Sequence, residues 1–258
     1  MVHSTSENGS AEWSVGASAI EFRLRMLIMT VIVMMGFWAP WIETWGIGDR
    51  ISLLEWLALE LGRLGVVRFT VATPVVIVVS VLLAAMAVVL RVWGTAYLGT
   101  GTVNNAEMKA GAVMADGPYC YVRNPLYLGS WCMLAAMAFV MPPTGALFTM
   151  VLTTIFLLRL ILGEEAFLSV KLGETYKAYL HAVPRLFPLL RSSLARRGNK
   201  PHWLRAVLAE LNPIGVFVTL AFLSWHYDNW LLIKALLVCF GVSLVVRALL
   251  PGNASSPD

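Results

Sequence analysis

A short segment between two apolar runs, residues 117–129 (GPYCYVRNPLYLG), concentrates side chains that can recognise a small charged ligand. Arg123 offers a fork of N–H donors suited to a carboxylate or a phosphate. Asn124 before Pro125 is typical of a helix start, so we expect Asn124 to cap a helix whose exposed N–H groups favour an anion. Three aromatic rings able to stack on a flat base or contact a cation complete the segment: Tyr119, Tyr121 and Tyr127.

A second group of charged side chains, Glu164 and Glu165, directly follows the apolar run 146–162. Two carboxylates at the end of an apolar helix are costly unless they are paired or solvated. Consecutive helical positions lie about 100° apart, so one carboxylate can face a ligand while the other faces water or a neighbour. Arg159, in the same run, either extends to the membrane surface or pairs with a carboxylate.

The turn between two apolar runs brings these two groups together. Only Pro142-Pro143-Thr144-Gly145 joins the runs 126–141 and 146–162, which predicts a helical hairpin. The outer ends of its helices, Arg123-Asn124 and Glu164-Glu165, must then return to the same membrane face. This combination predicts a receptor for a zwitterion, with carboxylates for an ammonium group and an arginine at a helix start for a carboxylate. A capped helix with interfacial tyrosines and an acidic flank is the purely structural alternative.

Composition indicates the class of protein that must position these residues. The 258-residue chain is 59% hydrophobic and 13% charged, with a mean hydropathy of +0.74. Soluble domains carry about 45–50% apolar and about 25% charged residues, so a soluble α/β enzyme and a disordered chain are both excluded. We expect an all-α polytopic helical membrane protein with a helical-hairpin core. About six spans are expected, at residues 26–42, 71–90, 126–141, 146–162, 214–225 and 230–250.

Two polar-flanked segments outside these spans have helical patterns of their own. Residues 51–67 contain charged positions within an apolar pattern and predict an interfacial amphipathic helix. Apolar residues recur with helical spacing over residues 168–179, which predicts a surface helix that packs against the candidate site, or covers it as a lid.

The placement of basic residues predicts the orientation of the chain. With the N-terminus inside, 14 of the 19 Lys and Arg residues fall in inner segments, and only Arg50, Arg63 and Arg68 fall in an outer segment. This bias predicts that both termini and the candidate site face the cytosol. The basic residues show no nucleic-acid pattern, and the three cysteines and four histidines lack metal-ligand spacing, so we expect neither partner.

The order of motifs resembles a known family, the integral-membrane methyltransferases, which comprise isoprenylcysteine carboxyl methyltransferases and phospholipid methyltransferases. GPYCYVRNPLYLG, then EE, LGETYKAY and VPRLFP follow the family pattern GPYxxVRHPxYxG, EExxL, FGxxYxxY and VPxxxP over roughly residues 110–190. The resemblance implies binding of S-adenosylmethionine at the cytosolic face and methylation of a membrane-embedded or lipophilic acceptor. Prenylcysteine carboxylates, phospholipid amines and thiols all stay open as that acceptor.

The chemistry of methyl transfer and the resemblance together suggest roles for individual residues. Glu165 is the best candidate for a base that removes a proton from the acceptor, and Arg159 is the second candidate catalytic residue. Asn124 replaces the family's usual His, so its side chain can form hydrogen bonds but cannot act as an acid or base. Cys120 and Leu172 replace the usual Arg and Phe. The implied cofactor contacts are Gly117, Tyr119, Tyr121, Arg123, Asn124, Tyr127, Gly129, Glu164 and Glu165.

These motifs also suggest how the chain is divided. A methyltransferase-like core spans residues 93–190. A disordered tail (1–22) and N-terminal spans with an interfacial helix (23–92) precede the core, and a basic linker with a C-terminal hairpin (191–250) and a tail (251–258) follow it.

Two other functions compete with methyl transfer. A sterol-type membrane reductase that uses NAD(P)H has a related motif, RHPNYxG followed by an acidic residue. Leu126 and Ser130 stand at its Asn and acidic positions here, which favours the methyltransferase. A non-catalytic scaffold that binds lipid is the third possibility, because Asn124 departs from the family pattern.

Overall fold

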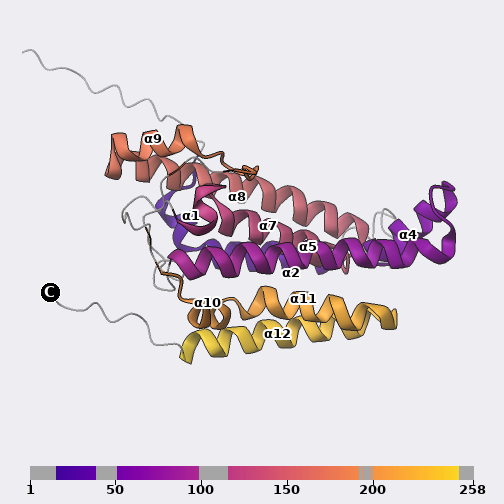
Figure 1. Ribbon diagram of the computed structural model, residues 1–258. Helices are drawn as coiled ribbons and strands as arrows, with labels where there is room; N and C mark the ends of the chain where they lie inside the picture. Colours follow the sequence, from indigo (N-terminus) through magenta and orange to yellow (C-terminus); the bar gives the residue numbers. More distant parts are fainter. Residues whose placement is uncertain are drawn as a thin grey trace, which may run out of the picture.

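The computed structural model describes residues 16–38, 51–98, 116–191, 194, 198 and 200–249, and the regular structure in these ranges is helical (Figure 1). The predicted all-α class is therefore confirmed. The helices are α1 (Ala19–Arg23), α2 (Arg25–Phe37), α4 (Leu53–Arg63), α5 (Phe69–Leu98), η1 (Gly117–Cys120), α7 (Pro125–Ala138), α8 (Pro143–Leu172), α9 (Glu174–Ala182), α10 (Trp203–Ala209), α11 (Leu211–Leu223), η2 (Ser224–His226) and α12 (Asn229–Leu249).

The helices differ in their ability to cross a membrane. Within the described ranges, Thr70–Leu98, Pro143–Leu172 and Asn229–Val246 are long and apolar enough to span one. Trp203–Ala209 and Leu211–His226, bent by 70°, can together form a fourth span. Each of the six predicted apolar runs contains a helix, but six spans are not confirmed. The helices α2 and α7 have 13 and 14 residues, whereas a span needs about 20.

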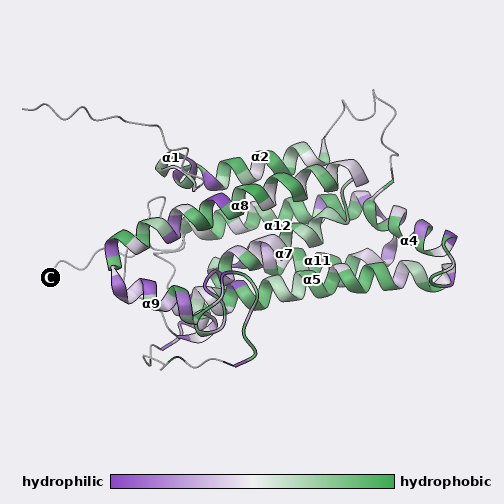
Figure 2. Cartoon of the chain, turned by 90° about the horizontal axis from the view of Figure 1, so that it is seen from above, coloured by the Kyte–Doolittle hydropathy of each residue, from purple (hydrophilic) through white to green (hydrophobic). Residues whose placement is uncertain are grey.

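The long helices lie alongside one another, with polar elements at both ends of the bundle. In Figure 1, α4 lies at one end, while α1, α9 and α10 lie at the other. Figure 2 shows apolar residues along the long helices and more polar residues towards their ends. The predicted amphipathic helix at 51–67 forms as α4, which begins at Leu53 because the side chains of Ser52 and Glu55 cap each other's backbone N–H groups.

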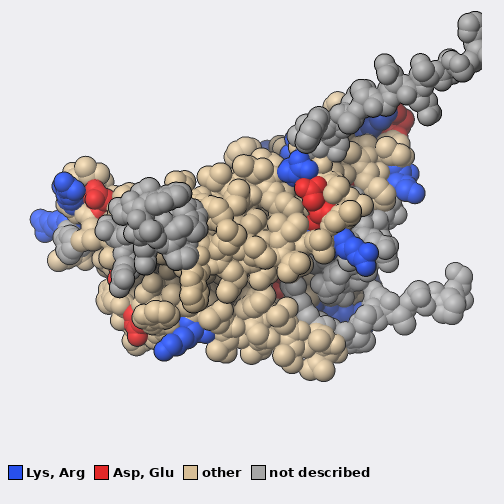
Figure 3. Space-filling model, turned by 180° about the vertical axis from the view of Figure 1, so that it is seen from behind, with Lys and Arg blue, Asp and Glu red and all other residues tan. Residues whose placement is uncertain are grey.

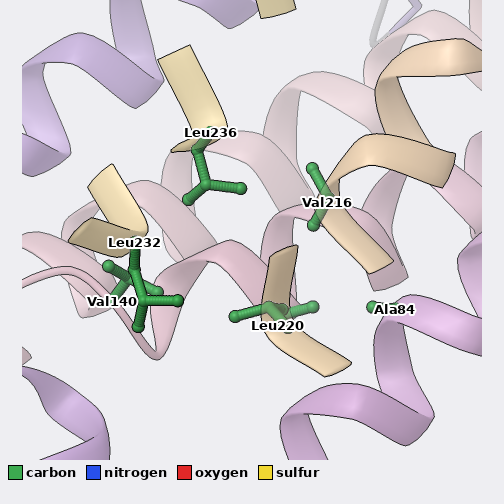
Figure 4. Close-up of a cluster of buried hydrophobic side chains, with 7 residues drawn as sticks. Ala84, Val140, Val216, Leu220, Leu232 and Leu236 are labelled. Atoms are coloured by element: carbon green, nitrogen blue, oxygen red, sulfur yellow. The ribbon is translucent and has the colours of Figure 1, made fainter. Parts of the chain in front are cut away.

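The C-terminal hairpin packs onto the core through a cluster of buried side chains. Ala84 of α5 and Val140 meet Val216 and Leu220 of α11 and Leu232 of α12 (Figure 4). All of these residues are at most 4% exposed. Helices α11 and α12 therefore pack against the same bundle that contains the candidate site.

The predicted hairpin of α7 and α8 forms, but α8 is longer than the sequence pattern indicated. It continues past residue 162 to Leu172, so Glu164 and Glu165 lie inside the helix and not after it. The expectation that these two carboxylates lie at the end of a helix is therefore wrong. The surface helix predicted over 168–179 is broken at Gly173, whose φ of +56° suits glycine and separates α8 from α9.

The close crossing of α2 and α8 leads to a stability prediction. A Cβ atom on Gly145 would overlap the carbonyl oxygen of Gly36, so Gly145→Ala must push the two helices apart. We expect this variant to have a lower unfolding temperature in detergent than the wild-type protein.

The control is Gly241→Ala on α12, because a Cβ at Gly241 meets no atom within 4 Å. Alanine favours a helix interior over glycine by roughly 0.5–1 kcal/mol, so the control should leave the unfolding temperature unchanged or raise it. Equal behaviour of the two variants would show that the α2–α8 crossing tolerates a methyl group.

Candidate active site

Glu165 is the centre of a buried group of charges at one end of the α7–α8 hairpin. Its side chain is 8% exposed, and it accepts two hydrogen bonds at Oε2 from Arg185, at 2.8 Å from Nη2 and 3.1 Å from Nε. Arg123 Nη1 lies 3.4 Å from Oε1, and Asn124 Nδ2 donates to the same oxygen at 3.1 Å. The convergence predicted from the short turn is therefore present for Arg123, Asn124 and Glu165. One carboxylate with two guanidinium groups leaves a net positive charge here.

Glu164 faces a different set of neighbours, as expected for the next position on a helix. Its Oε2 accepts a hydrogen bond of 2.8 Å from the hydroxyl of Tyr127 on α7. The positive charge of Arg25, near the start of α2, acts on this carboxylate. Within the described residues, no arginine salt bridge engages Glu164, in contrast to Glu165. Glu164 is therefore the carboxylate with the capacity to meet a ligand cation.

The segment that leads into α7 is held in place by local geometry and by α9. Gly117 has a φ of +57°, and a Cβ at this position would collide with the ring of Tyr97. The carbonyl of Tyr119 accepts a hydrogen bond of 2.8 Å from the hydroxyl of Tyr179 on α9. The ring of Tyr121 lies 6.1 Å from that of Trp93 on α5. Three of the predicted site residues thus line one turn between α5 and α9.

Helix α9 packs its apolar stripe against this turn and the end of α8. Tyr176, Tyr179 and Val183 form a buried cluster with Leu168 and Leu172. Burial raises the pKa of the Tyr176 and Tyr179 phenols above the usual value, so both remain neutral hydrogen-bond donors at physiological pH. The expected packing role of this stripe is present.

The start of α7 differs from the prediction in one detail that matters for ligand binding. Asn124 occupies the N-cap position, but its side chain does not cap the helix and instead donates to Glu165 and, at 3.3 Å, to the carbonyl of Arg185. A cap would use the amide oxygen as acceptor, whereas these two hydrogen bonds use the amide nitrogen as donor, so the two acceptors set the orientation of the side chain. The first backbone N–H groups of α7 therefore receive no side-chain cap.

Two buried polar atoms beside the helix start have no hydrogen-bond partner in the described part of the chain. They are Nε of Arg123 and the hydroxyl of Tyr119. Buried polar groups are nearly always satisfied, so these two donors are available for a hydrogen bond to a ligand. Burial also raises the pKa of the Tyr119 phenol well above its usual value.

Arg185 is the site residue that sequence reasoning missed. In the sequence, VPRLFP served only as a match to the family pattern, yet Arg185 makes the shortest contact to the Glu165 carboxylate. Backbone hydrogen bonds bring this motif to the site, from Arg123 N to the Pro184 carbonyl and from Leu189 N to the Tyr121 carbonyl, both 2.9 Å. The sequence did contain a signal for this role, because VPRLFP belongs to the same family pattern as the two glutamates and contains a basic residue that could pair with one of them.

Gly129 lies away from these charges, in the contact between α7 and α5. A Cβ on Gly129 would come within 2.6 Å of Cγ of Arg91, so glycine allows the Arg91 side chain to cross α7. Arg91 then reaches Ser130 Oγ at 2.5 Å and Glu210 Oε2 at 2.6 Å. Glu210 is fully buried and also accepts a hydrogen bond of 2.6 Å from Thr95.

Arg159 faces the N-terminal helix α1 and is not brought to Glu165. Its Nη2 lies 3.0 Å from Oε2 of Glu21, and its carbonyl accepts a 2.7 Å hydrogen bond from the N–H of Ala17. The hydrogen bond from Arg159 holds the pKa of Glu21 below its usual value. Helix α1 begins at Ala19 because Ser18 and Glu21 form a capping box, so regular structure starts before residue 23.

A comparison with protein families agrees with this geometry. Residues 75–175 match the family model for phospholipid methyltransferases. The matched range runs from α5 to the start of α9 and contains Arg123, Asn124, Glu164 and Glu165, whereas Arg185 lies beyond it. The resemblance to integral-membrane methyltransferases is therefore confirmed for this part of the chain. No significant match was found among curated proteins or among solved structures.

The match over residues 75–175 and the apolar helices are together typical of integral membrane methyltransferases. Within the described ranges, no three His, Cys, Asp or Glu side chains lie close enough together to hold a metal ion.

Proposed function

We propose that the protein transfers a methyl group from S-adenosylmethionine to a lipophilic or membrane-embedded acceptor. The observation that carries the proposal is the separation of charge in the candidate site. A carboxylate available to a cation, Glu164, lies on the helix next to a buried cluster with two arginines, at the uncapped start of α7. A ligand with an ammonium group and a carboxylate needs this pair of environments.

The side chains fit the methionine end of the cofactor. The unpartnered Nε of Arg123 and the first N–H groups of α7 suit its carboxylate. Glu164, which accepts one hydrogen bond from Tyr127, suits its ammonium group. The turn 117–121 with its tyrosine rings would hold the adenosine part, and aromatic rings also favour a sulfonium cation.

The residues of the site act mainly by position. When bound, the cofactor supplies a sulfonium methyl group that is already activated towards nucleophiles. The protein therefore has to orient the acceptor and exclude water. Glu165 has both oxygens engaged by Arg185, Arg123 and Asn124, so we assign it a positioning role for these donors. Glu164 takes its place as the candidate proton acceptor for an amine or thiol.

Arg159 also receives a revised role. Because it pairs with Glu21, we assign it to the attachment of α1 and not to the chemistry. Gly117, Tyr119, Tyr121, Arg123, Asn124, Tyr127 and Glu164 stay candidate cofactor contacts, while Gly129 serves the contact between α7 and α5.

The distribution of charge supports a cytosolic site. Lys and Arg gather mainly towards the two ends of the molecule, as Figure 3 shows for one face. The end that contains α9 and α10 belongs to the segments with the large excess of basic residues, which favours the cytosolic side. We infer that the site and both termini lie there, and that residues 93–190 form the methyltransferase core.

The test is binding of S-adenosylhomocysteine, the demethylated cofactor, to the purified protein in detergent by calorimetry. Glu164→Gln removes the proposed partner of the ammonium group and should weaken binding at least tenfold, or about 1.4 kcal/mol. The matched control is Glu174→Gln on α9, whose side chain is 87% exposed and pairs only with Lys177 among the described residues, and it should bind like the wild type.

Three results would contradict the proposal. They are no binding by the wild-type protein, equal binding by Glu164→Gln, and binding of a nicotinamide dinucleotide in its place, which would favour a reductase. Transfer of radiolabelled methyl groups into a total-membrane lipid extract then identifies the acceptor.

A further inference from the structure

The chain that follows α9 has one side turned towards the candidate site. We name residues 183–191 the strap. Arg185 of the strap holds Glu165, and two backbone hydrogen bonds join the strap to the segment before α7, from Arg123 N to the Pro184 carbonyl and from Leu189 N to the Tyr121 carbonyl. Val183 at its start is buried. The inner side of the strap is therefore fixed to the protein.

The outer side of the strap presents large apolar side chains to the surroundings. Phe187 is 86% exposed and Leu190 is 99% exposed, and Arg191 beside them is also exposed. These apolar residues do not belong to a membrane-spanning helix, so contact with the lipid core along a span does not account for them. The exposure of these large apolar side chains on a firmly attached segment therefore needs a different explanation.

The start of α10 continues this surface. Trp203 and Leu204 are 50% and 75% exposed, and Lys200 and Arg205 flank them. The N–H of His202 donates to the carbonyl of Ala96 near the end of α5, at 2.9 Å. The strap is connected to the same end of α5 through Tyr121. The carbonyl of Tyr121 accepts a hydrogen bond from Leu189 of the strap, and its ring lies beside that of Trp93 on α5. The strap and the start of α10 thus share one end of the bundle.

The charge of this region has a single sign. Residues 183–205 contain six Lys and Arg residues and no Asp or Glu. Aromatic and aliphatic side chains combined with basic ones are typical of surfaces that lie in the headgroup layer of an anionic membrane. The spans of this protein bring the end of the bundle to that layer, which favours a lipid surface over a protein partner.

We propose that the outer side of the strap and the start of α10 form a binding surface for anionic phospholipid headgroups. Phe187, Leu190 and Trp203 enter the boundary between headgroups and acyl chains, and Arg191, Lys200 and Arg205 contact lipid phosphates. The surface does not depend on methyl transfer, since none of these side chains belongs to the proposed cofactor site.

The experiment places an environment-sensitive fluorophore on the strap. Leu190→Cys, in a Cys239→Ser background, is labelled in the full-length protein, because the other two cysteines are buried. The protein is reconstituted in nanodiscs of phosphatidylcholine alone or of phosphatidylcholine mixed with phosphatidylglycerol. We expect the emission to shift to shorter wavelength and gain intensity in the anionic discs, and added salt should reduce this shift.

Two controls make the result specific. The label at Glu174→Cys, an exposed position of α9 at the same end of the bundle, should report the same aqueous emission in both discs. Reversal of charge in Arg191→Glu/Arg205→Glu should abolish the shift of the Leu190 probe. Aqueous emission at Leu190 in both discs, or a full shift in the charge-reversed variant, would overturn the proposal. The readout needs neither cofactor nor acceptor, so it is independent of whether the protein transfers methyl groups.

Discussion

Glu165→Ala is expected to abolish binding of S-adenosylhomocysteine and to lower the unfolding temperature in detergent markedly. The substitution leaves Arg123, with an 11% exposed side chain, without its counter-charge, and it releases Arg185 from the site. Removal of one partner from a buried ion pair costs about 3–5 kcal/mol, because the remaining charge stays desolvated. The two arginines also lose their orientation, so the strap and the start of α7 move apart.

Comparison with the neighbouring position separates binding from folding. Glu164→Gln should lose binding with little change in the unfolding temperature, because among the described residues no arginine salt bridge engages this carboxylate. Glu165→Gln keeps an oxygen acceptor for Asn124 and should lie between the wild type and Glu165→Ala in both measurements. If Glu165→Ala retains wild-type affinity and unfolding temperature, the ion-pair cluster has no role in forming the site.

Glu210→Ala is the second substitution with a large expected effect. Glu210 is 0% exposed and accepts hydrogen bonds from Arg91 Nε at 2.6 Å, Arg91 Nη2 at 3.1 Å and Thr95 at 2.6 Å. Its loss leaves a buried guanidinium without a counter-charge, again at a cost of about 3–5 kcal/mol. We expect a lower unfolding temperature in detergent and weaker attachment of the hairpin α11–α12 to α5.

A double variant tests whether the cost comes from the unpaired charge. Arg91→Met/Glu210→Leu removes both charges and replaces them with apolar side chains of similar length, which is often neutral or stabilising for buried pairs. We therefore expect the double variant to unfold at a higher temperature than Glu210→Ala alone. An equally low unfolding temperature for both would show that hydrogen bonds to Thr95 and Ser130, and not the unpaired charge, account for the loss.

Local patterns in the sequence were sufficient for the helical class and for half of the site. The predicted turn Pro142-Pro143-Thr144-Gly145 is too short for anything but antiparallel helices, so the chain before α7 and the acidic pair on α8 had to meet. In the structure the break between the two helices lies a few residues earlier, at residues 139–142, because α8 already begins at Pro143. Glu164 and Glu165 had to point in different directions because of the helical repeat. Both conclusions depend only on neighbours along the chain and on constant helix geometry.

Other features of the site depended on helix lengths that the sequence pattern did not reveal. The apolar pattern stops at residue 162, yet α8 continues to Leu172 because polar side chains in its last turns find partners on α7 and in the strap. Asn124 has the sequence signature of a cap, but a buried carboxylate from another helix binds its amide nitrogen, and the side chain does not cap α7.

The sequence by itself determined which residue types face one another across the hairpin, because a short turn leaves a single way to return. Only the tertiary structure decided the ion-pair partners. Glu165 meets Arg185, Arg159 meets Glu21 across 138 positions, and Arg91 meets Glu210 across 119 positions. The physical reason is that a charge partly or fully withdrawn from water pairs with whichever opposite charge the packing of helices brings within reach, and separation along the chain carries no information about that distance.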